Sequence, residues 1–194
     1  MNPQITSKGT DLPITLSEAK SSQRITGSTE DTLHTAMLMG AIEVAEEGTG
    51  RALTENTYVL RLCGFSDPAF VIDGIIKIPS VPLKSVTSVK YYDTDDSLQT
   101  LATSVYEVNI YKEPGTIKLA SGQSWPSLYD KGNNVEITYV AGYSNDGALD
   151  ETPEKLKQAI CLIFGEWNAN REDYAGRRLP KASERLINGE KVVY

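Results

Sequence analysis

The sequence predicts an α+β fold: a small helical core, with two long helices and short terminal helices, and a β-rich insertion between the long helices. Apolar residues recur with the helical period of about 3.6 near both ends of the chain. The middle of the chain is rich in Val, Ile, Thr and Tyr, which alternate with polar residues as in strands. We therefore expect one domain over residues 1–194, with the helical core at 12–52 and 152–194 and the insertion at 53–151.

The composition is that of an acidic globular protein. Of 194 residues, 40% are hydrophobic and 23% are charged, so the chain can bury a core, and its length suits one domain. No apolar run reaches the ~18 residues of a membrane helix, and the N-terminal residues lack the pattern of an export signal, so we expect no membrane association. The net charge of -7 disfavours tight binding to DNA phosphates, whereas an acidic channel wall would let DNA slide past.

The N-terminal part predicts an arm followed by a short helix. The first ten residues are polar, and we expect them to extend until a partner orders them. Thr15 or Ser17 can cap the following helix, Glu18 lies in its first turn, and Gly27 ends it.

A long helix is predicted after Ser28, which can cap it. Glu30 and Asp31 lie in its first turn, where the helix dipole favours negative charge, and Gly50 helps to end it. Spacings of four and three predict a buried face made of Leu33, Met37, Ala41, Val44 and Gly48.

Six segments in the middle of the chain are predicted to be strands, separated by clusters of Gly, Pro, Asp and Asn. Their close spacing favours an antiparallel meander or a small barrel. The six segments are 56–62, 74–79, 85–93, 104–111, 115–120 and 134–143.

Helical periodicity returns at Thr152, which can cap a helix whose first position suits Pro153. A shorter helix is predicted from Pro180 to the Asn188-Gly189 pair. The apolar stripe of the longer helix comprises Leu156, Ile160, Ile163, Phe164 and Trp167.

No catalytic or metal-binding motif is visible. His34 is the single histidine and has no nucleophile motif beside it, so we interpret it as structural. Cys63 and Cys161 form neither a redox pair nor a zinc motif, and we expect two buried, reduced thiols, as in a reducing cytoplasm. We predict no enzyme activity, no cofactor and no metal.

The acidic stretch Asp93–Asp96 does not fit a calcium loop, because Leu98 and Ser104 stand where Gly and Glu are needed, and a solvated hairpin turn is the better interpretation. The ten tyrosines suit cross-strand pairs better than base stacking. The basic cluster near the C-terminus is either solvated charge or a surface that docks on an acidic partner.

Seven segments follow one another in order: LPITLSEAKSSQRI, TEDTLHTAMLMGAIEVAEEGTGRAL, IPSVPLKSVTSVKYYDTD, YEVNIY, SWP, VEITYVAGY and TPEKLKQAICLIFGEWNANRE. In order and spacing, over residues 12–175, the chain resembles the head-tail connector (adaptor) proteins of tailed phages and prophages. The turn PSVP, the strand end YYDTD and the helix end NANRE carry much of the likeness. The strand-rich part looks long for that family.

The resemblance implies a structural protein. About a dozen copies would form a ring beneath the portal, extend the DNA channel and complete the head for tail attachment. The implied partners are other copies, the portal protein and the next neck or tail-completion protein, with DNA only passing through. The implied location is the head-tail junction of the virion, after assembly in the host bacterial cytoplasm.

The resemblance also implies that a C-terminal segment engages the portal, which we assign to 177–194. The predicted portal interface comprises Arg177, Arg178, Lys181, Arg185 and Leu186. The predicted intersubunit face comprises Glu43, Glu46, Glu47 and Arg51.

Two alternatives remain open from the sequence. The chain would also suit another neck or tail-completion protein. A different class is a carbohydrate- or peptide-binding β-module on a helical scaffold, with a site at Trp125 and neighbouring tyrosines.

Overall fold

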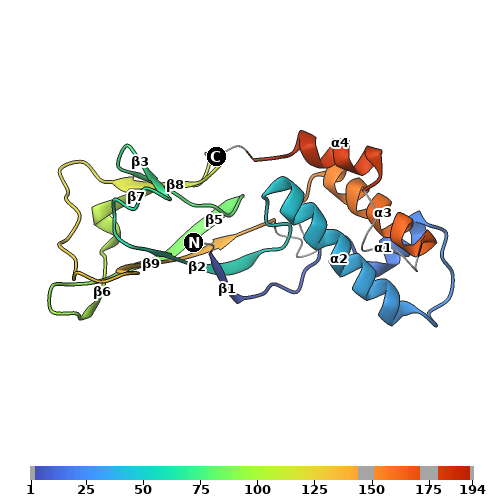
Figure 1. Cartoon of the computed structure of the whole chain (residues 1–194), viewed down its shortest axis with the longest axis horizontal. Coiled ribbons are helices and arrows are strands. Elements are labelled where there is room, and N and C mark those ends of the chain that lie inside the picture. Colours follow the sequence, from blue (N-terminus) through green and yellow to red (C-terminus); the bar gives the residue numbers. More distant parts are fainter. Residues whose placement is uncertain (1–2, 144–150, 171–178, 193–194) are drawn as a thin grey trace. The chain divides into compact units, whose positions relative to one another are not determined.

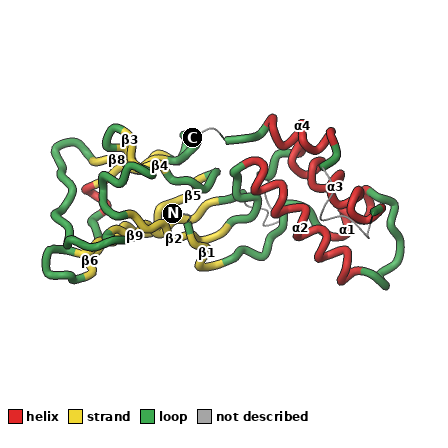
Figure 2. Tube along the Cα trace, viewed as in Figure 1, coloured by secondary structure: helices red, strands yellow, loops and turns green. Residues whose placement is uncertain are grey.

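The computed structural model describes residues 3–143, 151–170 and 179–192, which contain four α-helices and nine β-strands. These residues fall into two compact units (Figure 1). The β unit comprises the chain up to Gly9 and Glu55–Gly142, and the helical unit comprises Thr10–Thr54 and the chain from Tyr143 to residue 193. Figure 2 shows the α-helices gathered in one unit and the strands in the other.

The predicted fold class is wrong. The strands are not an insertion in a helical core, because they build two antiparallel sheets around buried side chains of their own. The β unit also recruits strand β1 (Gln4–Ser7) from before the first helix, where we expected a free arm. All four β1 side chains are exposed, so no alternation of apolar residues marks this strand in the sequence. Its pairing satisfies the backbone groups at the edge of β2.

The helical unit consists of α1 (Leu16–Ser22), α2 (Asp31–Thr49), α3 (Glu154–Ala169) and α4 (Lys181–Gly189). The Thr15 Oγ1 accepts a bond from the Glu18 N–H (3.2 Å) and the Glu18 carboxylate accepts one from the Thr15 N–H (2.7 Å), which is a complete capping box. Gly50 ends α2 with φ of 70°, a left-handed conformation that glycine adopts at little cost. None of the helices in the described ranges combines the length and apolarity needed to span a bilayer.

Helices α2 and α3 pack through their inner faces to form the core of the helical unit. The predicted stripe of α3 is confirmed, because all five of its residues are buried. On α2 the prediction is partly wrong: Met37 and Ala41 are buried, but Leu33 is exposed and Val44 half-buried. Apolar residues occur on most sides of α2, so the helical periodicity of its apolar residues is weak. The face that is buried also includes polar residues. The buried residues of α2 are His34, Met37, Leu38, Ala41, Ile42, Ala45 and Thr49.

The start of α2 also differs from the prediction. The helix begins at Asp31 after Glu30, and no side chain caps it, whereas Ser28 contributes only a backbone carbonyl that accepts from the Asp31 N–H. The close approach of α2 to α3 depends on Gly40, where a Cβ would lie 3.0 Å from the Trp167 ring.

The β unit contains two sheets rather than the expected meander or barrel. The first has the order β1-β2-β9-β5-β6 and the second the order β3-β4-β8-β7. Besides β1, the strands are β2 (Asn56–Leu62), β3 (Val71–Ile72), β4 (Ile75–Lys77), β5 (Leu83–Tyr92), β6 (Leu98–Thr100), β7 (Tyr106–Asn109), β8 (Thr116–Leu119) and β9 (Val135–Ala141). All six predicted strands exist, and β1, β3 and β6 are additional.

Strand β9 is the centre of the first sheet, because it pairs along its length with both β2 and β5. Its side chains alternate between buried and half-buried, as expected for a strand with one face on the core. Tyr58 of β2 lies opposite Tyr139 of β9, and the two rings stack at 5.4 Å. The Tyr139 hydroxyl is 3.0 Å from the Ser80 Oγ, which satisfies it in the core.

The two sheets approach closely at Gly115, which precedes β8. A Cβ at this position would lie 2.6 Å from the Cβ of Leu83, the buried first residue of β5. The Gly115 carbonyl also accepts a hydrogen bond from the Ile78 N–H (2.8 Å). The backbone therefore has little freedom to move away from an added side chain.

We expect Gly115→Ala to destabilise the β unit by about 1–3 kcal/mol, because overpacking forces backbone shifts. Urea unfolding followed by the fluorescence of Trp125, in a Trp167→Phe background, measures this unit. Gly132→Ala is the matched control, because a Cβ there meets nothing within 4 Å. Equal midpoints for the two variants would contradict the close approach.

We expect Thr15→Ala to destabilise the helical unit by about 1 kcal/mol at neutral pH, because it removes the cap of α1. The Thr15 side chain and then its backbone N–H lower the pKa of the Glu18 carboxyl through hydrogen bonds to the carboxylate. A lowered pKa contributes stability above the ordinary value of 4.5, and this contribution is lost as the pH falls through the folded pKa.

The cost of Thr15→Ala should therefore shrink between pH 7 and about pH 3. Urea unfolding at both pH values, followed by Trp167 fluorescence in a Trp125→Phe background, measures this difference, with Thr26→Ala in the exposed loop as the control. A cost that does not change with pH would rule out the Glu18 contribution.

Candidate interaction surfaces

A polar cluster ties the end of α2 to the chain that follows α4. The Arg51 Nε donates to the Glu190 carbonyl (2.8 Å) and its Nη1 donates to the Tyr143 hydroxyl (3.1 Å). The Val192 N–H donates to the Thr49 carbonyl (2.9 Å). Three separate segments of the helical unit are thereby joined around one guanidinium, whose planar fork suits such multiple contacts.

The predicted intersubunit face divides into two kinds of residue. Glu46 accepts a hydrogen bond from the Leu53 N–H (2.7 Å) and Arg51 is bonded as described above, so both serve contacts within the chain. Glu43 and Glu47 are exposed and one helical turn apart on α2. The structure therefore leaves these two carboxylates facing solvent.

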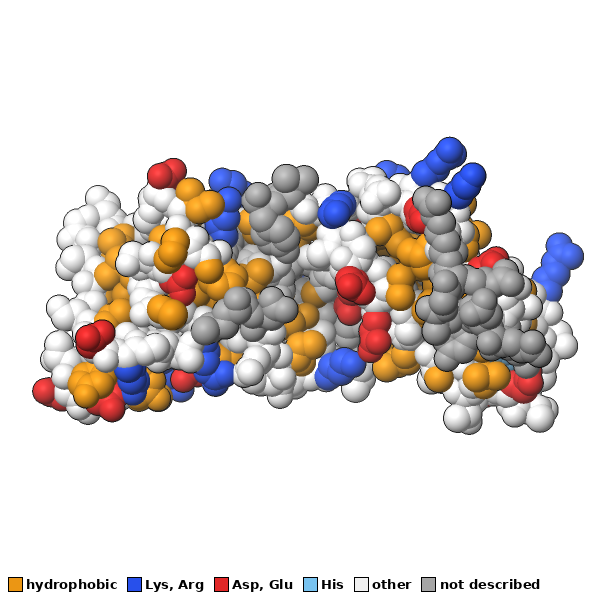
Figure 3. Space-filling model, in the orientation of Figure 1, with side chains coloured by type: hydrophobic (Ala, Val, Ile, Leu, Met, Phe, Trp, Pro, Cys, Tyr) orange, Lys and Arg blue, Asp and Glu red, His pale blue; other side chains and the backbone are white. Residues whose placement is uncertain are grey.

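The predicted portal interface centres on α4. Lys181 and Arg185 are exposed and one turn apart, and Leu186 is half-buried against the helical core. Arg177 and Arg178 lie outside the described residues. Figure 3 shows Lys and Arg side chains standing out over α4, and acidic side chains over α2.

Helix α4 presents these charges because its inner side is anchored. Ile187 and Ser183 are buried, and Ser183 Oγ donates to the Pro180 carbonyl at the helix start (2.8 Å). Gly48 of α2 leaves room for Ile187, since a Cβ there would lie 2.6 Å from the Ile187 Cγ2.

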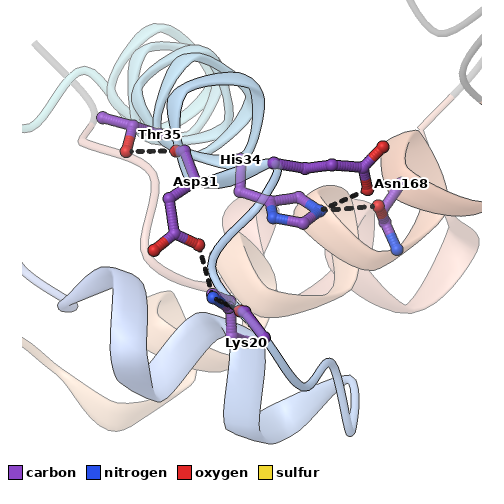
Figure 4. Close-up of polar contacts among 7 residues, drawn as sticks. Lys20, Asp31, His34, Thr35 and Asn168 are labelled. Carbon is purple, nitrogen blue, oxygen red and sulfur yellow. Dashed lines mark hydrogen bonds and ion pairs between the residues drawn. The ribbon is translucent and has the colours of Figure 1, made fainter.

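His34 lies inside the helical unit rather than in an open site (Figure 4). Its Nε2 is 3.2 Å from the Asn168 Oδ1 and 4.0 Å from the Glu30 carboxylate, and its ring meets Phe164 edge-on. Nearby, Lys20 of α1 pairs with Asp31 at the start of α2 (Figure 4). Through its contacts with Asn168 and Phe164, the buried His34 links α2 to α3.

The aromatic residues of the β unit pack mainly on one another. Trp125 stacks on Phe65 with ring centroids 4.3 Å apart, which covers one face of the indole. The Lys131 Nζ lies 3.4 Å from the centroid of Tyr92 and forms an ion pair with Asp96. Tyr58 and Tyr139 form the cross-strand pair that the sequence favoured.

The acidic stretch forms the predicted hairpin turn between β5 and β6. Asp93 accepts hydrogen bonds from the Ser97 and Asp95 N–H groups (both 3.0 Å) and from the Gln99 side chain (2.7 Å). The Ser97 bond is the main reason that the pKa of Asp93 lies below its ordinary value. This carboxylate stabilises the turn.

The expectation of two buried thiols is wrong for Cys63, which is exposed, while Cys161 is half-buried. Burial raises the pKa of the Cys161 thiol, so it stays protonated and weakly reactive. Within the ranges that the structure describes, His, Cys, Asp and Glu side chains do not gather in groups able to hold a metal ion.

Sequence reasoning missed the exposed apolar residues of the helical unit. Leu33 and Met39 of α2 and Leu162 of α3 all face solvent, although Leu33 was assigned to the core. Only the direction of the inner faces, known from the packed helices, distinguishes these positions from buried ones. The helical unit therefore displays both charged and apolar groups on its outer helix faces.

Solved structures share this fold over the whole chain. A chain from the neck of an empty GTA particle computed with C6 symmetry has a TM-score of 0.78 at 22% identity, covering 100% of this chain and 97% of that one. A chain from the virion of a native gene transfer agent (GTA) particle has a TM-score of 0.77 at 22% identity with the same coverage.

A chain from the neck of a native GTA particle computed with C12 symmetry has a TM-score of 0.73 at 21% identity, again covering 100% and 97%. No family model matches the sequence, and no curated protein matches it significantly. At these identities the likeness establishes the fold of the chain.

Proposed function

We propose that this chain is a structural head-tail connector of a tailed phage or phage-like particle, which assembles into a ring beneath the portal and extends the DNA channel. The observation that carries the proposal is the likeness of fold, over 100% of this chain and 97% of the other, to a chain in a particle neck. The residues in their sequence order favour the same class, because they resemble the connector family independently of the structure.

The symmetry of the similar structures supports a ring of copies. Their necks were computed with C6 and with C12 symmetry, which are cyclic arrangements of identical contacts. A cyclic ring requires two different, complementary surfaces on each copy. The helical unit displays an acidic surface at Glu43 and Glu47 of α2 and an exposed basic group, Lys155, on α3.

The charge of the chain suits a passage for DNA. With a net charge of -7, the subunit as a whole repels phosphates, so DNA would pass through a ring without being held. The structural surroundings of His34, between Asn168 and Phe164, agree with a role that involves no catalysis.

We assign the portal-facing surface to Lys181, Arg185 and Leu186 of α4, together with Arg177 and Arg178 before it.

We expect the purified protein, alone or mixed with its cognate portal protein, to form rings. Light scattering after size exclusion should give a mass of about six or twelve times the 21.2 kDa chain, and negative-stain images should show annular particles. A monomer at every concentration, both with and without portal, would contradict the proposal. Rings that never bind portal would instead favour another neck or tail-completion protein.

We expect Lys181→Glu/Arg185→Glu to weaken binding to the cognate portal by about tenfold or more, because both charges stand on the proposed interface. Lys8→Glu/Lys112→Glu is the matched control, since it makes the same charge change at two exposed positions of the β unit. Titrations by biolayer interferometry at two salt concentrations measure the difference. Equal loss in both variants would show that only net charge matters and would remove α4 from the interface.

A further inference from the structure

The helical unit exposes large hydrophobic side chains on two outward helix faces. In the described part of this unit these residues are Leu33, Met39 and Leu162, which are 40%, 37% and 38% exposed. The first two lie on α2 and the third lies on α3. Single exposed aliphatic groups occur on most soluble proteins, so only their order relative to the charged groups along each helix can indicate a surface that a partner covers.

The outward face of α2 has an apolar half and an acidic half. Its residues recur at spacings of four, three, four and four, directly opposite the buried side of the helix. Leu33 lies at the border of this face, in its apolar half. The exposed residues of the face are Thr32, Ala36, Met39, Glu43 and Glu47.

The outward face of α3 has the complementary order of groups. Lys155 lies near the start of the helix, Gln158 and Leu162 follow at helical spacing, and Ala169 lies at the end. All four residues are exposed. The face therefore begins with a basic group and continues with an amide and an apolar group, whereas the face of α2 ends with its acidic groups.

The two faces match when the helices run antiparallel. An α-helix rises 1.5 Å per residue, so Glu47 lies about 12 Å along the axis from Met39, and Lys155 about 10.5 Å from Leu162. With Met39 opposite Leu162, Glu43 therefore lies level with Gln158, and Glu47 lies within about 1.5 Å of the level of Lys155. One register of the two helices therefore forms an apolar pair, an amide-carboxylate pair and an ionic pair at the same time.

We propose that the outward face of α2 in one copy of this chain packs antiparallel on the outward face of α3 in the next copy. The proposal rests on the ring of the proposed function and names the contact that closes it. Because α2 and α3 share a core through their inner faces, their outward faces point away from it. Each copy can thus meet one neighbour through α2 and another through α3, which is a heterologous contact.

The remaining charges near these faces agree with this pairing. Lys155 lies 3.3 Å from the Glu190 carboxylate, but its side chain is 65% exposed and can also meet Glu47. Glu154, the acidic neighbour of Lys155, is paired with Lys157 at 2.9 Å. The contacts of Glu46 and Arg51 within the chain leave these two residues outside the interface.

Disulfide cross-linking tests the register directly. In a Cys63→Ser/Cys161→Ala background, Met39→Cys/Leu162→Cys should give a ladder of trimers and larger species under mild oxidation, because each copy would be bonded to two neighbours. Met39→Cys alone and Leu162→Cys alone should give no ladder, because a heterologous contact never places two identical positions together.

The mismatched control is Met39→Cys/Ala169→Cys, which moves the second thiol about 10.5 Å along α3, beyond the reach of a disulfide. Assembled protein that gives no ladder, or gives equal ladders with both pairs, overturns this contact and leaves the ring intact. Protein that light scattering finds monomeric in all conditions overturns the ring and the contact together.

Charge exchange provides a second readout. Glu47→Lys and Lys155→Glu should each raise the concentration at half-assembly by about tenfold, and the double exchange should return it to within about threefold of the original. A double variant as weak as the sum of the singles would overturn the pairing of Glu47 with Lys155. Urea unfolding of each variant separates loss of assembly from loss of folding.

Discussion

The packing of α2 against α3 is the contact on which the helical unit depends. The two helices are separated by more than half of the chain, and they approach closely at Gly40, where a Cβ would lie 3.0 Å from the Trp167 ring. Helix α4 is anchored on the same core through Ile187, and the Arg51 contacts add the chain that follows it. By burying the inner faces, this packing also determines which side chains of the two helices remain exposed.

The β unit likewise depends on one long-range contact, because β9 lies between β2 and β5 and pairs with both. The chain passes between the two units after Gly9, Thr54 and Gly142, so each unit is completed by segments distant in sequence. Neither unit can complete its core until the chain has returned to it. Such non-local pairing has a cost in loop entropy that long-range contacts must offset.

The fold engages some of the charged side chains of α2 in contacts within the chain and leaves others exposed. A carboxylate that accepts a backbone hydrogen bond, such as Glu46, contributes to the end of its own helix, whereas Glu43 and Glu47 project from a rigid helix into solvent. Rigid helices present charges with little loss of side-chain and backbone freedom on binding, which favours specific contacts between many identical copies.

The sequence by itself determined six of the strands, the buried stripe of α3 and the capping of α1. These depend on local period and local capping, which neighbouring residues carry. The tertiary structure decided the division into two units, the pairing of β1 and the side of α2 that is buried. An edge strand with four exposed side chains, such as β1, shows no alternation of apolar and polar residues. A helix that is apolar on most of its sides, such as α2, can bury any one of those sides. Only the partner that packs against each element decides which groups are buried, and therefore which groups form the candidate interfaces.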